Sequence, residues 1–189
     1  MIKQFTYEIE GGASMVLETE RLILREMTLD DYASLYQVLA DSDIMQHYPY
    51  TFDEKRVRGW ITRNMERYQI FGFGLWAVVL KETNEMIGDC GMTMQMIGDM
   101  IKPEIGYHIR KDCQRKGYAK EAATAVRDWA FHNTPFQVIY SYMKYTNLPS
   151  YSTAISWGCK QVDEFEDEVN ERTKVFAITR EEWKQIINQ

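Results

Sequence analysis

Residues 104–133 read EIGYHIRKDCQRKGYAKEAATAVRDWAFHN, and the spacing of their apolar residues changes from that of a strand to that of a helix. Residues 104–109 are typical of a strand, residues 110–116 of a polar loop, and from Ala119 onward small apolar residues recur at helical spacing. The N-terminus of a helix has backbone N–H groups without helical partners and the positive end of the helix dipole, so it favours an anion. Gly117 lets a ligand approach the main chain at this point. The sequence therefore predicts a phosphate or diphosphate site at this junction.

The composition fits one globular domain. The chain has 189 residues, 45% of them hydrophobic and 26% charged, which is enough for a substantial core. No apolar run reaches the roughly 20 residues of a membrane span, and the N-terminus does not resemble a signal peptide. Three widely separated cysteines indicate neither a disulfide framework nor a metal site. We therefore expect a cytoplasmic protein without a bound metal, with a flexible extension at residues 1–14 and a single domain at residues 15–189.

The charge of the chain limits the class of partner. A formal net charge of −6 argues against non-specific nucleic-acid binding, which needs a surplus of cations to neutralise phosphates. An acidic surface would suit a cationic or amine substrate, although a modest net charge mostly serves solubility. We expect no nucleic-acid partner and no membrane partner.

The predicted elements follow the order strand, two helices, three strands, helix, strand, helix, two strands and a terminal helix. Strands are predicted at residues 21–26, 75–80, 86–94, 104–109, 138–142, 159–165 and 173–179. Helix-start signals occur at Thr28 and at Thr51, where the pattern TFDE predicts a capping box. Later helices are predicted after residue 117, within residues 147–157 and at residues 180–189. Because helices and strands do not alternate regularly, the fold class is α+β.

With these elements in place, the chain resembles the GNAT superfamily of acetyl-CoA-dependent N-acetyltransferases. The residues QRKGYA at 114–119 fit the family pattern Gln/Arg-x-x-Gly-x-Gly/Ala at a junction from strand to helix. Other matches occur in the right order and resemble the branch named for ribosomal-protein alanine acetyltransferases. They are RLILR at 21–25, EIGY at 104–107, EA at 121–122, Asn147-x-x-Ser150 and Gly158.

The resemblance covers about residues 17–179 and implies a fold and a donor substrate. The fold would be a mixed, mostly antiparallel sheet with splayed central strands and helices on both faces, and a homodimer is common in the branch. The pantetheine arm of acetyl-CoA would lie in the gap between the splayed strands. The backbone of His108, Ile109, Arg110 and Lys111 would bond that arm, Gln114, Arg115, Lys116, Gly117, Tyr118 and Ala119 would surround the diphosphate, Lys120 would screen it, and Asn147 and Ser150 would lie beside the thiol.

Two side chains near the expected cofactor are candidates for the general base. Acetyl transfer needs a neutral amine, so a carboxylate or imidazole must accept its proton. Glu104 is the first candidate, and the alternative is a solvated carboxylate at a strand end. His108 lies on the same face of a regular strand and has a suitable ordinary pKa; the alternative is a structural histidine.

The general acid and the acceptor residues follow a weaker pattern. Many GNAT enzymes carry a tyrosine four residues before a Gly-Phe pair, where this chain has Ala154 and Gly158-Cys159. Ser150 or Tyr151 therefore remains as a proton donor, and coenzyme A can also leave without one. Tyr48 and Tyr50, in the loop before residue 51, are predicted to contact the acceptor.

The predicted activity is transfer of an acetyl group from acetyl-CoA to a primary amine, either a protein N-terminus or a small amine, within a ternary complex. The alternative is a catalytically silent acyl-CoA-binding module that senses or regulates. A nucleotide-binding α/β protein would need a Gly-rich loop after an early strand, and the sequence has none. The identity of the acceptor stays open, because fold does not select it.

Overall fold

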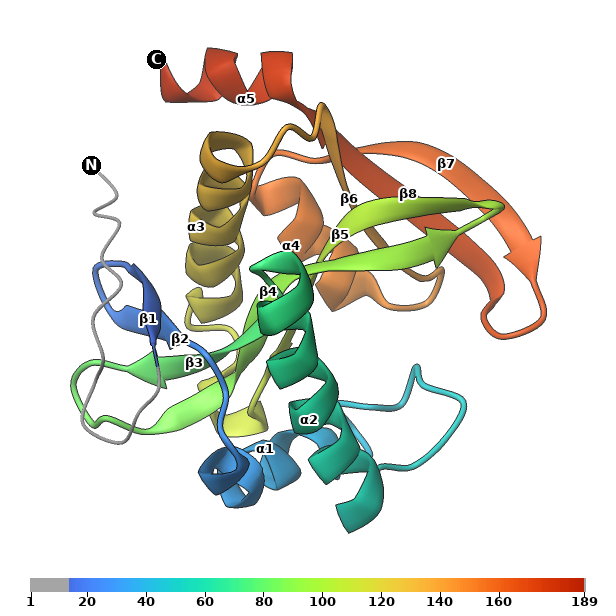
Figure 1. The fold of residues 1–189 in the computed structure, drawn as a ribbon. Coiled ribbons are helices and arrows are strands. Elements are labelled where there is room, and N and C mark those ends of the chain that lie inside the picture. Colours follow the sequence, from blue (N-terminus) through green and yellow to red (C-terminus); the bar gives the residue numbers. More distant parts are fainter. Residues whose placement is uncertain (1–13, 189) are drawn as a thin grey trace.

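The structure is a computed structural model that describes residues 14–188. The extension predicted at residues 1–14 lies outside the described residues except for Ser14, whose carbonyl accepts a hydrogen bond from Glu26 N at 3.0 Å. Eight strands form one sheet in the order β1-β2-β3-β4-β5-β6-β8-β7 (Figure 1). Their bounds are β1 Met15–Glu18, β2 Leu22–Arg25, β3 Leu75–Leu80, β4 Met86–Ile97, β5 Met100–Ile109, β6 Val138–Lys144, β7 Lys160–Asp167 and β8 Glu171–Thr179.

The sheet opens at its centre. Neighbouring strands are antiparallel everywhere except between β5 and β6, which run parallel. Within the described residues, β5 and β6 are in register at one pair, Glu104 and Tyr140, whereas β4 and β5 pair from Gly88 and Ile109 to the turn that joins them. The predicted mixed, mostly antiparallel sheet with splayed central strands is confirmed.

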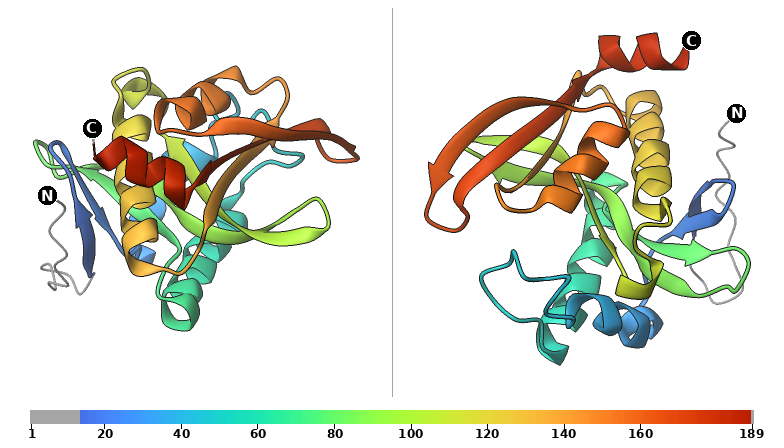
Figure 2. Two further views of the ribbon diagram at one scale, coloured as in Figure 1. Left: turned by 90° about the horizontal axis from the view of Figure 1, so that it is seen from above. Right: turned by 180° about the vertical axis from the view of Figure 1, so that it is seen from behind.

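Helices cover both faces of the sheet, as predicted. Their bounds are α1 Tyr32–Leu39, α2 Glu54–Phe71, α3 Tyr118–Asn133, α4 Leu148–Ser156 and α5 Arg180–Ile187, with short 3-10 turns at Leu29–Asp31 and Lys111–Cys113. On β3, Trp76 and Val78 face one core with residues of α3, whereas Leu75, Ala77 and Val79 face a second core with residues of α1 and α2. Figure 2 shows the two groups of helices from above and from behind.

Local sequence chemistry explains the ends of the long helix α2. Asp53 has an extended backbone, and its side chain accepts a hydrogen bond from Arg56 N, which makes it the N-cap. Gly72 ends the helix with φ of +74°, a left-handed conformation that favours glycine. The predicted capping box at Thr51 is therefore wrong, because the helix begins two residues later.

Two further predictions differ from the structure. Strand β1 was not predicted, because four residues carry too little periodicity until β2 pairs with them. The hairpin of β4 and β5 is longer than the predicted strands at residues 86–94 and 104–109, because both strands continue to a turn at Gly98 and Asp99. As a result Glu104 lies in the middle of β5. None of the helices described here is both long and apolar enough to cross a membrane.

Candidate active site

A large cleft follows the opening between β5 and β6. It has a volume of about 1330 Å³ and is lined by the loop before α2, by α2 itself, by β5 and β6, and by the start of α3 and of α4. Pockets for drug-sized ligands have volumes of about 300–1,000 Å³. The cleft is therefore large enough for an extended ligand or for two ligands at once.

One end of the cleft is the N-terminus of α3. Gly117 is the N-cap with φ of +85°, and the first helical donor is Glu121 N, which reaches Gly117 O at 3.0 Å. Among residues 14–188, no acceptor takes a hydrogen bond from the backbone N–H groups of residues 115–120. Free amides and the positive end of the helix dipole occur together here, so this end of the cleft can bind a diphosphate.

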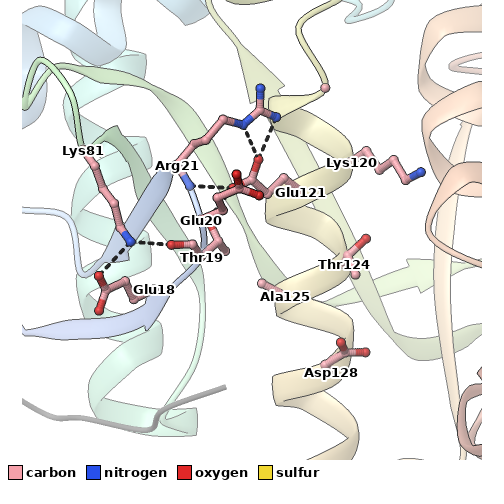
Figure 3. Close-up of a pocket in the computed structure, with 11 residues that line it drawn as sticks. Glu18, Thr19, Glu20, Arg21, Lys81, Lys120, Glu121, Thr124, Ala125 and Asp128 are labelled. Carbon is pink, nitrogen blue, oxygen red and sulfur yellow. Dashed lines mark hydrogen bonds and ion pairs between the residues drawn. The ribbon is translucent and has the colours of Figure 1, made fainter. Parts of the chain in front are cut away.

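The turn between β1 and β2 holds this end of α3 in place (Figure 3). Glu121 accepts hydrogen bonds from Thr19 Oγ1 at 2.6 Å, Arg21 N at 2.9 Å and Arg21 Nε at 2.7 Å. Arg21 also donates to Lys116 O at 2.9 Å, and its guanidinium lies 4.5 Å from the centre of the Tyr118 ring. Glu121 therefore has a structural role, because it joins the turn between β1 and β2 to the first turn of α3.

Glu104 lies near the middle of the cleft and is almost completely buried. Its side chain accepts a hydrogen bond from Thr93 Oγ1 at 3.3 Å, and its carboxylate lies over Gly106, where an added Cβ would be 3.3 Å from Oε2. Burial raises the pKa of Glu104 to about 7, against the opposing effects of His108, Thr93 and Arg67. The alternative of a solvated carboxylate at a strand end is therefore excluded.

His108 belongs to a chain of buried polar groups. Its Nδ1 lies 2.7 Å from Asp89 Oδ1, and its Nε2 lies 2.9 Å from the hydroxyl of Tyr48. Asp89 is completely buried and also accepts a hydrogen bond from Trp60 Nε1 at 2.8 Å. Burial lowers the pKa of His108, but the charges of Asp89 and Glu104 together raise it more, so the net pKa is above its ordinary value.

The two predicted acceptor tyrosines both line the cleft. Burial and the charges of Glu104 and Asp89 raise the pKa of Tyr48 well above its ordinary value, so its hydroxyl remains protonated. Tyr50 is exposed at the mouth of the cleft, and its ring packs 5.3 Å from that of Phe52. Tyr48 and Tyr50 therefore form part of the cleft wall supplied by the loop before α2.

Residues of α4 form the other wall. Asn147 caps the helix by accepting a hydrogen bond from Ser150 N at 3.2 Å. The hydroxyl of Tyr107 donates to Ser150 O at 2.7 Å and lies 3.5 Å from Ser150 Oγ. Ser150 lines the cleft, whereas the ring of Tyr151 stacks on Phe176 at 5.7 Å. Of the two proton donors left open by the sequence, only Ser150 contacts the cleft.

The remaining predicted cofactor residues divide into two groups. The cleft is lined by His108, Ile109, Gln114, Arg115, Gly117, Tyr118, Ala119, Lys120 and Asn147. Three others have side-chain or backbone partners of their own: Arg110 pairs with Asp112 and Glu85, Lys111 with Asp43, and Lys116 O accepts from Arg21.

Sequence reasoning missed three polar residues of this site. Asp89 holds His108, Thr93 holds Glu104, and Arg67 on α2 lines the cleft. A signal for Asp89 was available, because it is the one charged residue in the predicted strand at residues 86–94. A buried charge is rarely found without a partner and often has a functional role.

Comparisons with known proteins point to one family. Residues 21–160 match the family described as "Acetyltransferase (GNAT) domain". The chain is 35% identical over 126 residues to YkkB of Bacillus subtilis, covering 66% of this chain and 73% of YkkB. It is 26% identical over 176 residues to the N-acetyltransferase YnaD of the same organism, covering 89% and 99%.

Solved structures also share the fold. A GNAT-family acetyltransferase from Bacillus anthracis is 25% identical with a TM-score of 0.74, and the match covers 87% of this chain and 98% of the other. The ribosomal-protein-S5-alanine acetyltransferase from Vibrio fischeri is 15% identical with a TM-score of 0.71, covering 88% and 97%. At the lower identity the likeness concerns the fold alone.

Proposed function

Because this chain belongs to the GNAT acetyltransferase family and is an N-acetyltransferase, we propose that it transfers the acetyl group of acetyl-CoA directly to a primary amine while both substrates are bound. The family resemblance seen in the sequence is thereby confirmed. One observation carries the proposal: a single cleft joins the free amides at the start of α3 to the buried carboxyl group of Glu104.

The donor end of the cleft fits acetyl-CoA, which supplies the activated acetyl group when it is bound. The amides of residues 115–120 have no acceptor among the described residues and suit a diphosphate. Arg115 and Lys120 line the same end and add positive charge. Asn147 and Ser150, on the wall formed by α4, would lie beside the pantetheine arm and the thiol.

Glu104 is the general base in this proposal. The acceptor amine must lose a proton before it attacks a thioester, and a base is most effective when its pKa lies near the working pH. A pKa of about 7 meets that condition, whereas an ordinary glutamate of about 4.3 would be a weak base. His108 lies on the same face of β5, and Asp89 fixes its Nδ1, so it can orient or relay the proton.

Direct transfer is favoured because the thiol that lines the cleft is a poor nucleophile. Burial, followed by the charge of Asp112, raises the pKa of Cys113, and a protonated thiol does not readily accept an acyl group. A carboxyl group with a raised pKa, such as that of Glu104, would have no use in a silent acyl-CoA-binding module. This raised pKa therefore favours the enzyme over the sensor.

The test is an acceptor screen with two measurements. Coenzyme A release from acetyl-CoA is followed with amines and N-terminal peptides, and mass spectrometry identifies the acetylated product. In parallel, the intact mass of the protein is measured after incubation with acetyl-CoA alone, and we expect it to be unchanged. An acetylated protein that passes its group to an amine would overturn direct transfer, and tight binding without turnover across the panel would support the sensor.

A further inference from the structure

Two arginines on one side of α2 line the cleft without an acidic partner. Arg63 and Arg67 are four residues apart, so their side chains lie one above the other on the helix. Among residues 14–188, neither has a carboxylate within 4.0 Å, whereas Arg58 on the same helix pairs with Glu54 at 2.9 Å. Arg63 is exposed to solvent, whereas Arg67 is partly buried and has no counter-ion, so the place for a ligand that supplies negative charge is at Arg67, with Arg63 beside it.

Arg67 is held in position by a buried amide. Asn64 is completely buried, and its Nδ2 donates to Trp60 O at 2.9 Å. Its Oδ1 accepts from Leu75 N at 2.9 Å and from Arg67 Nη1 at 3.2 Å. A guanidinium has five N–H donors, and no described residue accepts a hydrogen bond from the other four. The group is therefore oriented in advance, with most of its donors available.

The electrostatics of Arg67 fit the same interpretation. The side chain is half-buried, and burial together with the nearby Arg63 lowers the pKa of Arg67. Glu104 acts in the opposite direction, so the two groups sense each other across the cleft, although they do not form an ion pair. An anion bound between the two arginines would offset the cost of burying the charge of Arg67 and the repulsion between the two guanidinium groups.

These arginines are distinct from the cations of the donor end. Arg115 and Lys120 lie at the start of α3, next to the free amides. Arg63 and Arg67 come from α2, which covers the opposite face of the sheet, in the core shared with α1. Glu104 lies in the same cleft and senses Arg67. The two arginines therefore belong to the acceptor side of the cleft.

We propose that the acceptor is a small amine that also carries an oxyanion, a carboxylate or a phosphate, and that Arg67 and Arg63 bind this oxyanion while the amine lies at Glu104. This inference rests on the function proposed above and narrows its substrate class. A guanidinium binds a carboxylate or phosphate through two parallel hydrogen bonds. The local charges thus select a zwitterionic acceptor, in contrast to the cationic substrate that the net charge of the chain alone would favour.

The test uses acceptors in matched pairs. An amino acid is compared with its amide, and an aminoalkyl phosphate with the corresponding amino alcohol, over several spacings between amine and anion. We expect kcat/KM to be higher for the anionic member of at least one pair. Arg67→Gln should lower that value roughly 10- to 100-fold, the usual loss for a hydrogen bond to a charged group, and should lower kcat/KM for the neutral member much less, so that the ratio within the pair falls.

Two variants serve as controls. Arg67→Lys keeps the charge but not the two parallel hydrogen bonds, so its kcat/KM for the anionic acceptor should lie between those of the wild type and Arg67→Gln. Arg58→Gln changes the same residue type on the same helix outside the cleft and should have no effect on either member. For each pair, kcat/KM of the anionic member is divided by that of the neutral member. The pair with the larger ratio shows whether the oxyanion is a carboxylate or a phosphate.

Several outcomes would overturn the inference. Equal use of anionic and neutral acceptors, or a preference for N-terminal peptides, would remove the oxyanion site and leave the transferase function intact. If no amine is acetylated at all, the proposed function fails, and calorimetry with the coenzyme A-bound protein still tests the site. If the anionic amines bind and Arg67→Gln weakens their binding, the oxyanion site is supported. If they do not bind, the oxyanion site is excluded.

Discussion

The two ends of the cleft differ in what satisfies their polar groups. Around Glu104 and His108, the protein supplies the partners: Thr93, Asp89 and Tyr48 all lie within hydrogen-bond distance. At the start of α3, the backbone N–H groups of residues 115–120 have no partner among the described residues. The first end is therefore arranged before any ligand binds, whereas the second keeps its amides available for the diphosphate that we propose.

This difference has a thermodynamic consequence. Groups that the protein satisfies have the same partners with and without a ligand, whereas binding of a ligand adds stability through the groups that only the ligand satisfies. Changes at the start of α3 should therefore affect affinity for acetyl-CoA most, and changes near Glu104 should affect rate and the response to pH.

The largest effect is expected for Gly117→Glu. Gly117 has φ of +85°, and an added Cβ would lie 3.3 Å from Arg21 Nη2, so the side chain would bring a carboxylate to the anion site. We expect the affinity for acetyl-CoA, measured by calorimetry, to fall by at least roughly 100-fold, because the new charge repels a diphosphate. Circular dichroism should show an unchanged fold.

A matched variant separates charge from backbone strain. Gly72 also has a positive φ, +74°, and an added Cβ there meets nothing within 4 Å. Gly72→Glu should cost about 1–2 kcal/mol of stability, as Gly117→Glu does, without changing the affinity. Unchanged affinity in Gly117→Glu would contradict the donor site.

A smaller effect, on rate, is expected for Glu104→Gln. If Glu104 is the base, kcat/KM of the wild type rises with pH through the pKa of about 7. The variant should lack this rise with pH and lose roughly 100- to 1,000-fold in rate above about pH 7, where the wild-type carboxyl group is ionised; the loss should shrink at lower pH, where that group is protonated. Glu104→Asp keeps a carboxylate and should retain part of the rise of kcat/KM with pH. A pH profile that does not change in Glu104→Gln would exclude the role.

The same variant should alter stability in the opposite direction. The pKa of Glu104 is raised on folding, so the native state binds more protons than the unfolded state between about pH 4.5 and 7, and stability falls as pH rises through that range. Glu104→Gln removes this cost. Chemical denaturation should show it to be more stable than the wild type by roughly 3 kcal/mol at pH 8, with little difference at pH 4.

The smallest effect is expected for Asp89→Asn. The charge of Asp89 raises the pKa of His108, and burial alone lowers it. In the variant, the pKa of His108 should fall relative to the wild type, because burial is then opposed by the charge of Glu104 alone, and NMR titration of the imidazole would measure the change. We expect a rate loss of about 10-fold, because His108 only assists Glu104.

Asp128→Asn is a suitable control for that change. Asp128 also accepts an indole hydrogen bond, from Trp183 Nε1 at 2.8 Å, but it lies outside the cleft around Glu104. It should leave both the rate and the pKa of His108 unchanged. An unaltered His108 pKa in Asp89→Asn would break the proposed coupling between the two residues.

Local features of the site were predictable from the sequence. The anion site at Gly117 depends on a loop, a glycine and the first turn of a helix, all within residues 114–120. The same is true of the cap formed by Asn147 on Ser150, three residues apart. Such features depend on neighbours in the chain, so residue pattern alone indicates them.

The buried half of the site was not predictable in the same way. The sequence identified Glu104 and His108 as candidates but left each beside a structural alternative. Burial of Glu104 depends on a hairpin that extends beyond the predicted strand, and Asp89 meets His108 only because β4 and β5 pair in one register. Arg67 reaches the cleft because α2 packs across the sheet.

The sequence by itself indicated the family, through motifs in a characteristic order, and it indicated the order of most elements and the proposed place for a diphosphate, since these depend on residues close in the chain. Only the tertiary structure decided which carboxyl group is buried away from solvent, which histidine has an acidic partner and which arginines lack one. A pKa is set by every group within a few ångströms, and strands and helices far apart in the sequence bring those groups together.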